Sequence, residues 1–496
     1  MEAVKNIPLF AIVLSLFSGV LCTMLKNKAA RIYTVLFECA LIAGMALVLI
    51  YTLQTGTSFT YVMGEFPAPW GNEIRAGALE AGMALLFLIV MLMSVIAGMH
   101  YLGDMDASRV HLYAALLNLM TAALLAEIFT NDIFTGYVFV EIMTLTSCGI
   151  LIVREIGRTT LAAIRYMIMN LLGSGLFLLG VVLLYDVTGH LLMVPMHREI
   201  IELMKDPGSA LVLTMATGIL TLGLAIKSGL FPFHYWMPDT YGWATPTSAA
   251  ILSSLVSKCY IFLLIKIYWR VLGTDVFAAM PLKYILFALG LCGMVFGSVS
   301  ALRATNINRM VAFSSAAQIG YIYAGIGLGG RYGWIAAIFH IAVHAVTKSM
   351  LFLTTPRLAE VSDNSLLFKN LTGSAIRDRD AGAFFLMGSL SMIGIPIFAG
   401  FSSKLLFGIA AVSSASEPMM LLLMLALALS SVLNALYFLR TVIRIFRDDG
   451  SRKICPIGGR WDYLMPMLVL IVINLLLGLA SGVFVGWIET GLSMFA

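Results

Sequence analysis

The stretch AIKSGLFPFHYWMPDTYGWATPTSAAILSSLVSK, residues 225–258, decides how this chain folds. It places Lys227 after a long apolar run, interrupts the helix with Gly229, Pro232 and two further prolines, and then reaches Lys258. In a bilayer, a helix breaks only where neighbouring protein or water satisfies the freed backbone groups. The stretch therefore predicts a hydrated path inside a membrane protein, and a lysine buried on such a path is functional by default.

The composition predicts an all-α, polytopic membrane protein. Of 496 residues, 60% are hydrophobic and only 11% are charged, against roughly 25% charged residues in soluble domains. The six cysteines are scattered singly, which argues against iron–sulfur, haem or zinc ligation and against a disulfide framework. We find no dinucleotide-binding motif, and we expect no cofactor, no metal and no nucleic-acid partner. No redox or hydrolytic site is legible, so enzyme status depends on the complex to which the chain belongs.

Apolar runs of spanning length number about fourteen, at roughly 20 residues each. They centre on residues 7–25, 31–53, 78–100, 108–129, 132–153, 160–185, 211–237, 245–270, 279–301, 311–329, 332–355, 381–413, 418–446 and 462–490. The runs at 211–237 and 381–413 are broken. We expect a short hairpin around GEFPAPWGN (residues 64–72), and a loop or surface helix between residues 190 and 207.

Basic residues in the loops predict the orientation. If the loop with Lys26, Lys28 and Arg31 is cytoplasmic, that side receives about 18 basic residues, Arg154 and the run from Arg440 to Arg460 included. The other side receives about 7. The positive-inside rule therefore puts both termini outside, in a plasma (inner) membrane.

Two broken helices predict an internal repeat. KSGLFPFHYWMP and MIGIPIFAGFSSK each carry one lysine, Lys227 and Lys404. Paired broken helices at corresponding places in two halves point to inverted repeats. We place five-helix repeats at residues 108–270 and 279–446, a three-helix segment at 1–107 and a C-terminal helix at 447–496.

Glu141 lies near the middle of an apolar helix and is the predicted partner of Lys227. Burial favours the neutral form of a lysine, and a nearby carboxylate favours the charged form. Moving Glu141 toward or away from Lys227 would therefore switch the lysine between holding and releasing a proton. The alternative is that Glu141 and Lys227 form an ion pair with a purely structural role.

His340, His344 and Lys348 repeat at i, i+4 and i+8, which aligns them on one helix face about 6 Å apart in rise. A metal site would lack a third ligand close by, and a packed histidine face is the ordinary alternative. A hydrated proton relay fits best, because imidazole titrates near neutrality.

The other titratable residues in apolar runs are unequal candidates for a role in proton movement. Lys258 and Lys404 lie deep, whereas we expect Lys266, four residues before Arg270, to snorkel to the interface. Arg165 lies six residues into its helix and could also snorkel, so its role stays open. His234, on the broken helix, could add a step. Glu38 and Glu80 rank lower because no partner is legible.

Four motifs carry a family resemblance: NDIFTGYVFVE; the stretch at 225–258; NINRMVAFSSAAQIGYI; and FHIAVHAVTKSMLF followed by GIPIFAGFSSK. The chain resembles the antiporter-like, proton-translocating subunits of Mrp cation/proton antiporters, membrane-bound hydrogenases and respiratory complex I, and most of all the Mrp D-type subunit. The resemblance covers residues 100–410. Arg165 departs from it, since a titratable lysine is common there.

The resemblance implies roles at the matching positions. Glu141 and Lys227 correspond to the first half-channel, Lys258 to the connecting lysine, and Lys404 to the second half-channel. His340, His344 and Lys348 correspond to the central relay. It also implies A- and C-type Mrp-like partners, or hydrogenase-like or complex I-like ones. Sodium transport, and the choice between an antiporter and a redox-driven pump such as an NADH dehydrogenase-like complex, stay open, and a stand-alone solute transporter is the further alternative.

Overall fold

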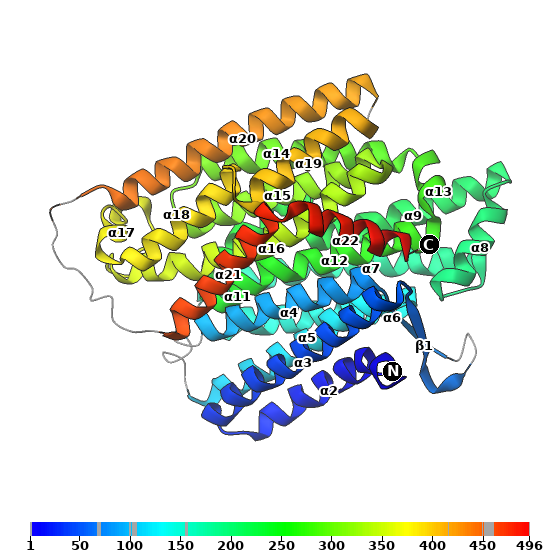
Figure 1. Ribbon diagram of the computed structural model, residues 1–496, viewed down its shortest axis with the longest axis horizontal. Coiled ribbons are helices and arrows are strands. Elements are labelled where there is room, and N and C mark those ends of the chain that lie inside the picture. Colours follow the sequence, from blue (N-terminus) through cyan, green and yellow to red (C-terminus); the bar gives the residue numbers. More distant parts are fainter. Residues whose placement is uncertain are drawn as a thin grey trace.

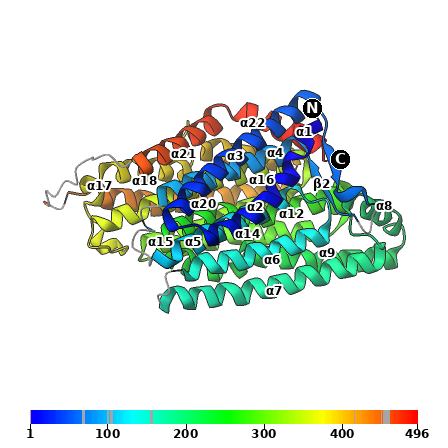
Figure 2. The same cartoon turned by 90° about the horizontal axis from the view of Figure 1, so that it is seen from below.

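The computed structural model describes residues 2–66, 71–98, 101, 107–153, 157–414, 416–448, 450 and 461–495. Figures 1 and 2 show a bundle of long helices whose axes are roughly aligned. Within the described residues, 13 helices are long and apolar enough to cross a membrane. The prediction of an all-α polytopic membrane protein is confirmed.

The unbroken long helices are α2 (Ile7–Met24), α3 (Asn27–Thr55), α4 (Ala78–Gly98), α5 (Ala107–Phe129), α6 (Ile133–Ile152), α7 (Gly157–Thr188), α14 (Leu282–Arg303), α15 (Ile307–Leu328), α16 (Gly330–Glu360), α20 (Glu417–Phe446) and α21 (Trp461–Leu479). The broken spans are α9 (Pro207–Ser228) with α10 (Met237–Trp243), and α18 (Arg379–Ile393) with α19 (Ala399–Ser414). Helices α11 (Pro246–Ile251) and α12 (Ser257–Ile267) form one continuous span, joined by a π-helical turn. Short helices are α1 (Glu2–Lys5), α8 (Met193–Leu203), α13 (Thr274–Ala279), α17 (Ser374–Arg377) and α22 (Ser481–Ser493).

The predicted spans match these helices, with one correction at the C-terminal end. The run at 381–413 forms the two half-helices α18 and α19, neither of which spans by itself, as its predicted break requires. The run at 462–490 is not one helix, because α21 ends at Leu479 and α22 begins again at Ser481. The C-terminal segment therefore holds two helices, and periodicity alone could not detect this turn because both sides of it are apolar.

The ends of the bundle carry the irregular structure. Strands β1 (Phe59–Val62) and β2 (Glu73–Ala76) form the expected antiparallel hairpin, and α8 is the expected helix in the polar stretch. Figure 1 shows both chain termini at the end that carries β1, α8 and α13, and α17 at the opposite end. The loop residues 67–70, Arg154, and the basic positions at 452, 453 and 460 lie outside the described residues.

Two helical spans occupy the centre of the bundle. The apolar windows of the span at Pro246–Leu272 and of α16 are buried over their whole length, whereas only 28% of the corresponding windows of α3 and α20 is buried. Lys258 lies on the first of these central spans, and His340, His344 and Lys348 lie on the second. Both of these central spans therefore carry titratable side chains in the interior of the bundle.

The turns that precede α6 and α15 are built in the same way, at opposite ends of the bundle. Asp132 caps α6 by accepting a hydrogen bond from the Thr135 amide at 2.6 Å, and Asn306 caps α15 by accepting from the Asn308 amide at 2.8 Å. The Ile133 amide donates to the Leu191 carbonyl, and the Ile307 amide donates to the Leu366 carbonyl, each at 3.0 Å. Each cap thus pairs with the segment that follows the next long helix.

Close contact between α7 and α9 depends on glycine. A Cβ on Gly223 would lie 2.5 Å from the backbone nitrogen of Phe177, whereas a Cβ on Gly218, earlier on α9, would meet nothing within 4 Å. Small residues allow backbones to approach in membranes, where the hydrophobic effect does not drive helices together. The position of α9, and of Lys227 on it, therefore depends on Gly223.

We expect Gly223→Ala to lower the melting temperature of the detergent-purified protein. Overpacking costs about 1–3 kcal/mol, more than the roughly 1 kcal/mol that alanine gains in helix propensity. Gly218→Ala is the matched control on the same helix and should leave the melting temperature unchanged or raise it. Equal melting temperatures of the two variants would contradict the close contact.

Candidate functional site

Helix breaks of the same geometry end α9 and α18. Gly229 and Gly394 have φ of +79° and +92°, a region that favours glycine. The Gly229 amide donates to the carbonyls of Ala225 and Ile226, and the Gly394 amide donates to those of Leu390 and Ser391, at 3.0 to 3.2 Å. Glycine thus closes both half-helices with a Schellman-like turn. The turn is buried at Gly229 and partly exposed at Gly394.

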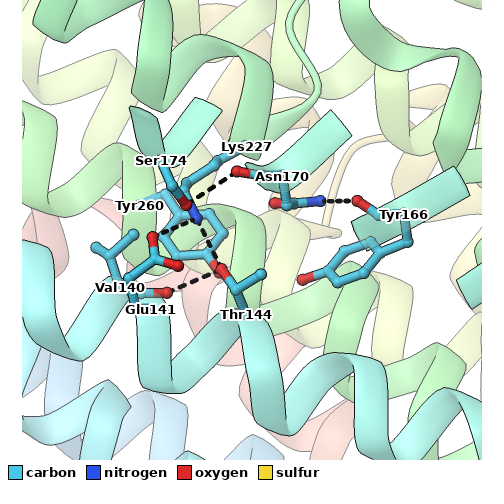
Figure 3. A network of polar contacts seen from close by, with 8 residues as sticks. All are labelled: Val140, Glu141, Thr144, Tyr166, Asn170, Ser174, Lys227 and Tyr260. Carbon is cyan, nitrogen blue, oxygen red and sulfur yellow. Dashed lines mark hydrogen bonds and ion pairs between the residues drawn. The ribbon is translucent and has the colours of Figure 1, made fainter. Parts of the chain in front are cut away.

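Lys227 lies two residues before the first break and pairs with Glu141 of α6. Its ammonium is 3.3 Å from Glu141 Oε1 and donates to Thr144 Oγ1 at 2.7 Å (Figure 3). The Lys227 side chain is fully buried, whereas 25% of the Glu141 side chain is exposed. Glu141 and Thr144 are neighbours because they are three residues apart on one helix. The predicted Glu141–Lys227 pair is present, with its carboxylate at the outer side.

Hydroxyl groups surround this ion pair. The Tyr260 hydroxyl lies 3.3 Å from Thr144 Oγ1, and the Lys227 ammonium lies 5.6 Å from the Tyr260 ring centre. Figure 3 shows Tyr166, Asn170 and Ser174 of α7 beside the pair. The Tyr166 hydroxyl is buried beside the hydroxyls of Ser147 and Tyr260, which extends the polar group around the pair.

Glu127 of α5 belongs to the same site and is missing from the predicted residues. It is fully buried, with its carboxylate against the Cys259 thiol. It interacts electrostatically with both Lys227 and Glu141. The signal was present in the sequence, since an acidic residue inside the apolar run at 108–129 meets the criterion that selected Glu141.

Lys258 occupies the central span where the helix widens. Residues Leu252–Val256 form a π-helical turn (η4), a feature that is frequent at functional sites. The Lys258 ammonium donates to the carbonyl of Ser253 within this turn, and the side chain is fully buried. The ion pairs of the described residues do not include Lys258. This lysine therefore lies in the interior with a carbonyl partner and no carboxylate.

The predicted face of α16 points to the same region. The Lys348 ammonium donates to the carbonyl of Val311 at 3.0 Å and to Ser314 Oγ at 2.8 Å, both on α15. Lys348 and His344 each interact electrostatically with Lys258. Both ring nitrogens of His344 are buried without a partner in the described protein. Buried polar groups are normally satisfied, so these nitrogens indicate a place for water.

The second break holds the end of this cluster. His340 Nδ1 lies 2.7 Å from Ser403 Oγ on α19, and its ring is 6.2 Å from that of His344. The Lys404 ammonium donates at 2.6 Å to the carbonyl of Ile393, in the last turn of α18. The negative end of the α18 dipole favours a cation at this point. The structure therefore gathers Lys258, Lys348, His344, His340 and Lys404 around α16.

The secondary candidates lie apart from this cluster. The Arg165 guanidinium is 2.5 Å from Asp239 Oδ2, and its side chain is 56% exposed. His234 is buried and stacks against Phe231 and Tyr235 in the short η3 turn (Phe233–Trp236) between α9 and α10.

The prediction for the position of Lys266 is wrong. Lys266 does not snorkel to the interface, because its side chain is fully buried and its ammonium donates to the carbonyls of Ile128 and Thr130, each at 2.6 Å. These carbonyls end α5, where cations are favoured. The depth of Lys266 along its helix can be counted from the sequence, but the side of the helix that faces protein cannot.

The fold and site define a class: a multi-pass membrane protein with broken helices around a buried row of lysine and histidine. The chain belongs to the NADH:quinone oxidoreductase/Mrp antiporter transmembrane family, whose profile matches residues 130–480. It is 30% identical over 499 residues to the N subunit of the NADH-quinone oxidoreductase of Desulforudis audaxviator, covering 96% of each chain. It is 25% identical over 450 residues to the D-type subunit of the Na(+)/H(+) antiporter of Alkalihalophilus pseudofirmus, covering 89% of this chain and 87% of that one.

A solved structure has the same fold. A chain of the membrane-bound sulfane sulfur reductase, an archaeal respiratory membrane complex, superimposes with a TM-score of 0.88 at 23% identity, over 100% of this chain and 98% of that one. The resemblance inferred from the four motifs is therefore confirmed at the level of family and fold.

Proposed function

We propose that this chain is an antiporter-like, proton-translocating subunit of a multisubunit membrane complex. The observation that carries the proposal is the bonding of Lys258, Lys348 and Lys404. Lys258 and Lys348 are fully buried and Lys404 is partly buried. Each donates to carbonyl or hydroxyl oxygens, and within the described chain none has a carboxylate at ion-pair distance. A buried ammonium without a counter-charge is costly, and such groups mark proton relays in membranes.

In this proposal, Glu141 and Lys227 form the first half-channel and Lys404 the second. Lys258, His344, Lys348 and His340 connect the two through water. Glu141 is the partly exposed member of its pair, so its movement changes how strongly Lys227 holds a proton. Glu127, which interacts electrostatically with Lys227 and has no ion-pair partner among the described residues, offers this lysine a second carboxylate.

The half-channels correspond to two inverted repeats at residues 108–270 and 279–446, flanked by segments 1–107 and 447–496. The matched helix breaks at Gly229 and Gly394 support this division, and so do the matched caps at Asp132 and Asn306. We place both termini outside a plasma (inner) membrane, from the distribution of Lys and Arg.

The first candidate for the complex is an Mrp cation/proton antiporter, with this chain as its D-type subunit beside A- and C-type partners and Na+ as the exchanged ion. The D-type relative from a Na(+)/H(+) antiporter supports it. The second is a redox-driven pump of the complex I or hydrogenase type, which the 30% identical relative from an NADH-quinone oxidoreductase favours.

Purification of the full-length chain with its native partners tests this proposal. The complex, extracted in mild detergent and placed in liposomes with a trapped pH dye, should move protons when a Na+ gradient is imposed and should contain only hydrophobic partners. Iron–sulfur partners with proton movement driven only by electron transfer would instead support the second candidate. A fully active single chain that carries a solute without protons would contradict both.

A further inference from the structure

A groove of about 510 Å³ lies beside the end of α20. The segment between α16 and α18, which contains α17, packs against this end of α20 (Figure 1). The Gly373 amide donates at 3.4 Å to the carbonyl of Arg444, which fixes this segment to the last turn of α20. None of the residues that line the groove is assigned to proton movement. Its lining combines basic and aliphatic side chains.

Four cations line this groove. Arg440, Arg444 and Arg447 follow one another at i, i+4 and i+7, so they share one face of α20. Lys369 comes from the short η6 turn (Phe368–Asn370). Within the described residues none of the four forms an ion pair, and no acidic side chain lines the groove. The helix dipole favours cations at the end of α20, but it does not explain Lys369, which belongs to another segment.

An exposed apolar stripe leads along α20 to this groove. Its members, 42% exposed or more, are Leu421, Leu425, Leu429, Val432, Leu436, Leu439 and Ile443. From Leu421 to Arg440 the helix rises about 28 Å at 1.5 Å per residue, close to the roughly 30 Å hydrocarbon thickness of a bilayer. The arginines therefore begin where the hydrocarbon ends, at the level of lipid headgroups.

We propose that this groove binds an anionic phospholipid. The phosphate lies among Lys369, Arg440 and Arg447, and the acyl chains lie along the apolar stripe. Basic pockets at the membrane boundary attract anionic headgroups at about 1 kcal/mol per cation. A lipid fits better than an acidic protein segment, because cations and stripe are continuous on one helix and match the phosphate and acyl parts of one molecule.

Native mass spectrometry of the full-length chain, purified with its partner subunits in neutral detergent, tests the proposal. The probes are phosphatidylglycerol and phosphatidylcholine with identical acyl chains. We expect tighter binding of phosphatidylglycerol, and a loss of affinity for it of about a hundredfold in Lys369→Gln/Arg440→Gln/Arg447→Gln, from three charges at about fivefold each. Lys26→Gln/Lys28→Gln/Lys205→Gln removes the same charge at exposed positions elsewhere and should bind as the unmodified protein does.

Lys369→Gln alone covers the case in which the triple variant fails to fold, because Lys369 is exposed and lies outside the long helices. Its affinity for phosphatidylglycerol should fall about fivefold. Equal binding of the two lipids by the unmodified protein would overturn the proposal. So would an equal loss in the control variant. Loss of a partner subunit from the triple variant, with its lipid preference unchanged, would assign the groove to protein instead.

Discussion

Lys227→Ala should reduce proton movement by the reconstituted complex to the leak of protein-free liposomes. Lys227 is the buried cation of the first break, and its removal takes away the group that Glu141 and Thr144 contact. Assembly should persist, because the Schellman-like turn at Gly229 is made by backbone groups and does not use the lysine side chain. Acidification is read from a trapped pH dye, and assembly from the subunits that co-purify.

Lys227→Arg separates proton exchange from structural pairing. Arginine keeps the positive charge beside Glu141 but does not release its proton in proteins. We therefore expect this variant to assemble and to remain inactive. Lys205→Ala, at an exposed lysine paired with Glu202, is the matched control and should transport normally. Full proton movement in Lys227→Arg would reduce the pair to a structural role.

Lys404→Ala should abolish proton movement to a similar extent. Its ammonium lies on the Ile393 carbonyl at the second break, and it interacts electrostatically with His340. Loss of this lysine would disconnect the proposed second half-channel from the histidines of α16. The readout is again dye-reported acidification, at equal amounts of assembled complex.

Lys404→Gln separates the structural role from proton exchange. Glutamine keeps a hydrogen-bond donor for the Ile393 carbonyl but cannot bind and release a proton. We expect a stable, inactive protein. A variant that is both stable and fully active would show that Lys404 serves only to close the end of α18.

The sequence was sufficient for the spans, the two breaks and most of the titratable row. Glycine and proline inside apolar runs have few explanations in a membrane, and the i, i+4, i+8 spacing of His340, His344 and Lys348 needs only a helix to align them. It was insufficient for partners on other helices. Ser403, Val311 and Ser314 contact the row only because α15 and α19 pack against α16.

The errors have the same origin. The prediction for Lys266 placed it at the interface because Arg270 lies one turn away, but both side chains are buried in protein. The sequence shows Glu127 as an acidic residue inside an apolar run, but it does not show that Lys227 and Cys259 of other helices are its neighbours. Helix rotation and neighbour identity depend on tertiary packing, which periodicity does not contain.

A cryo-EM map that resolves ordered water around α16 gives the most direct measurement. If protons pass along this row, density for water should contact the two unpartnered nitrogens of His344 and connect Lys348 and Lys258 with His340 and Lys404. Dry, closely packed apolar side chains around His344, with no solvent density between these groups, would contradict the account.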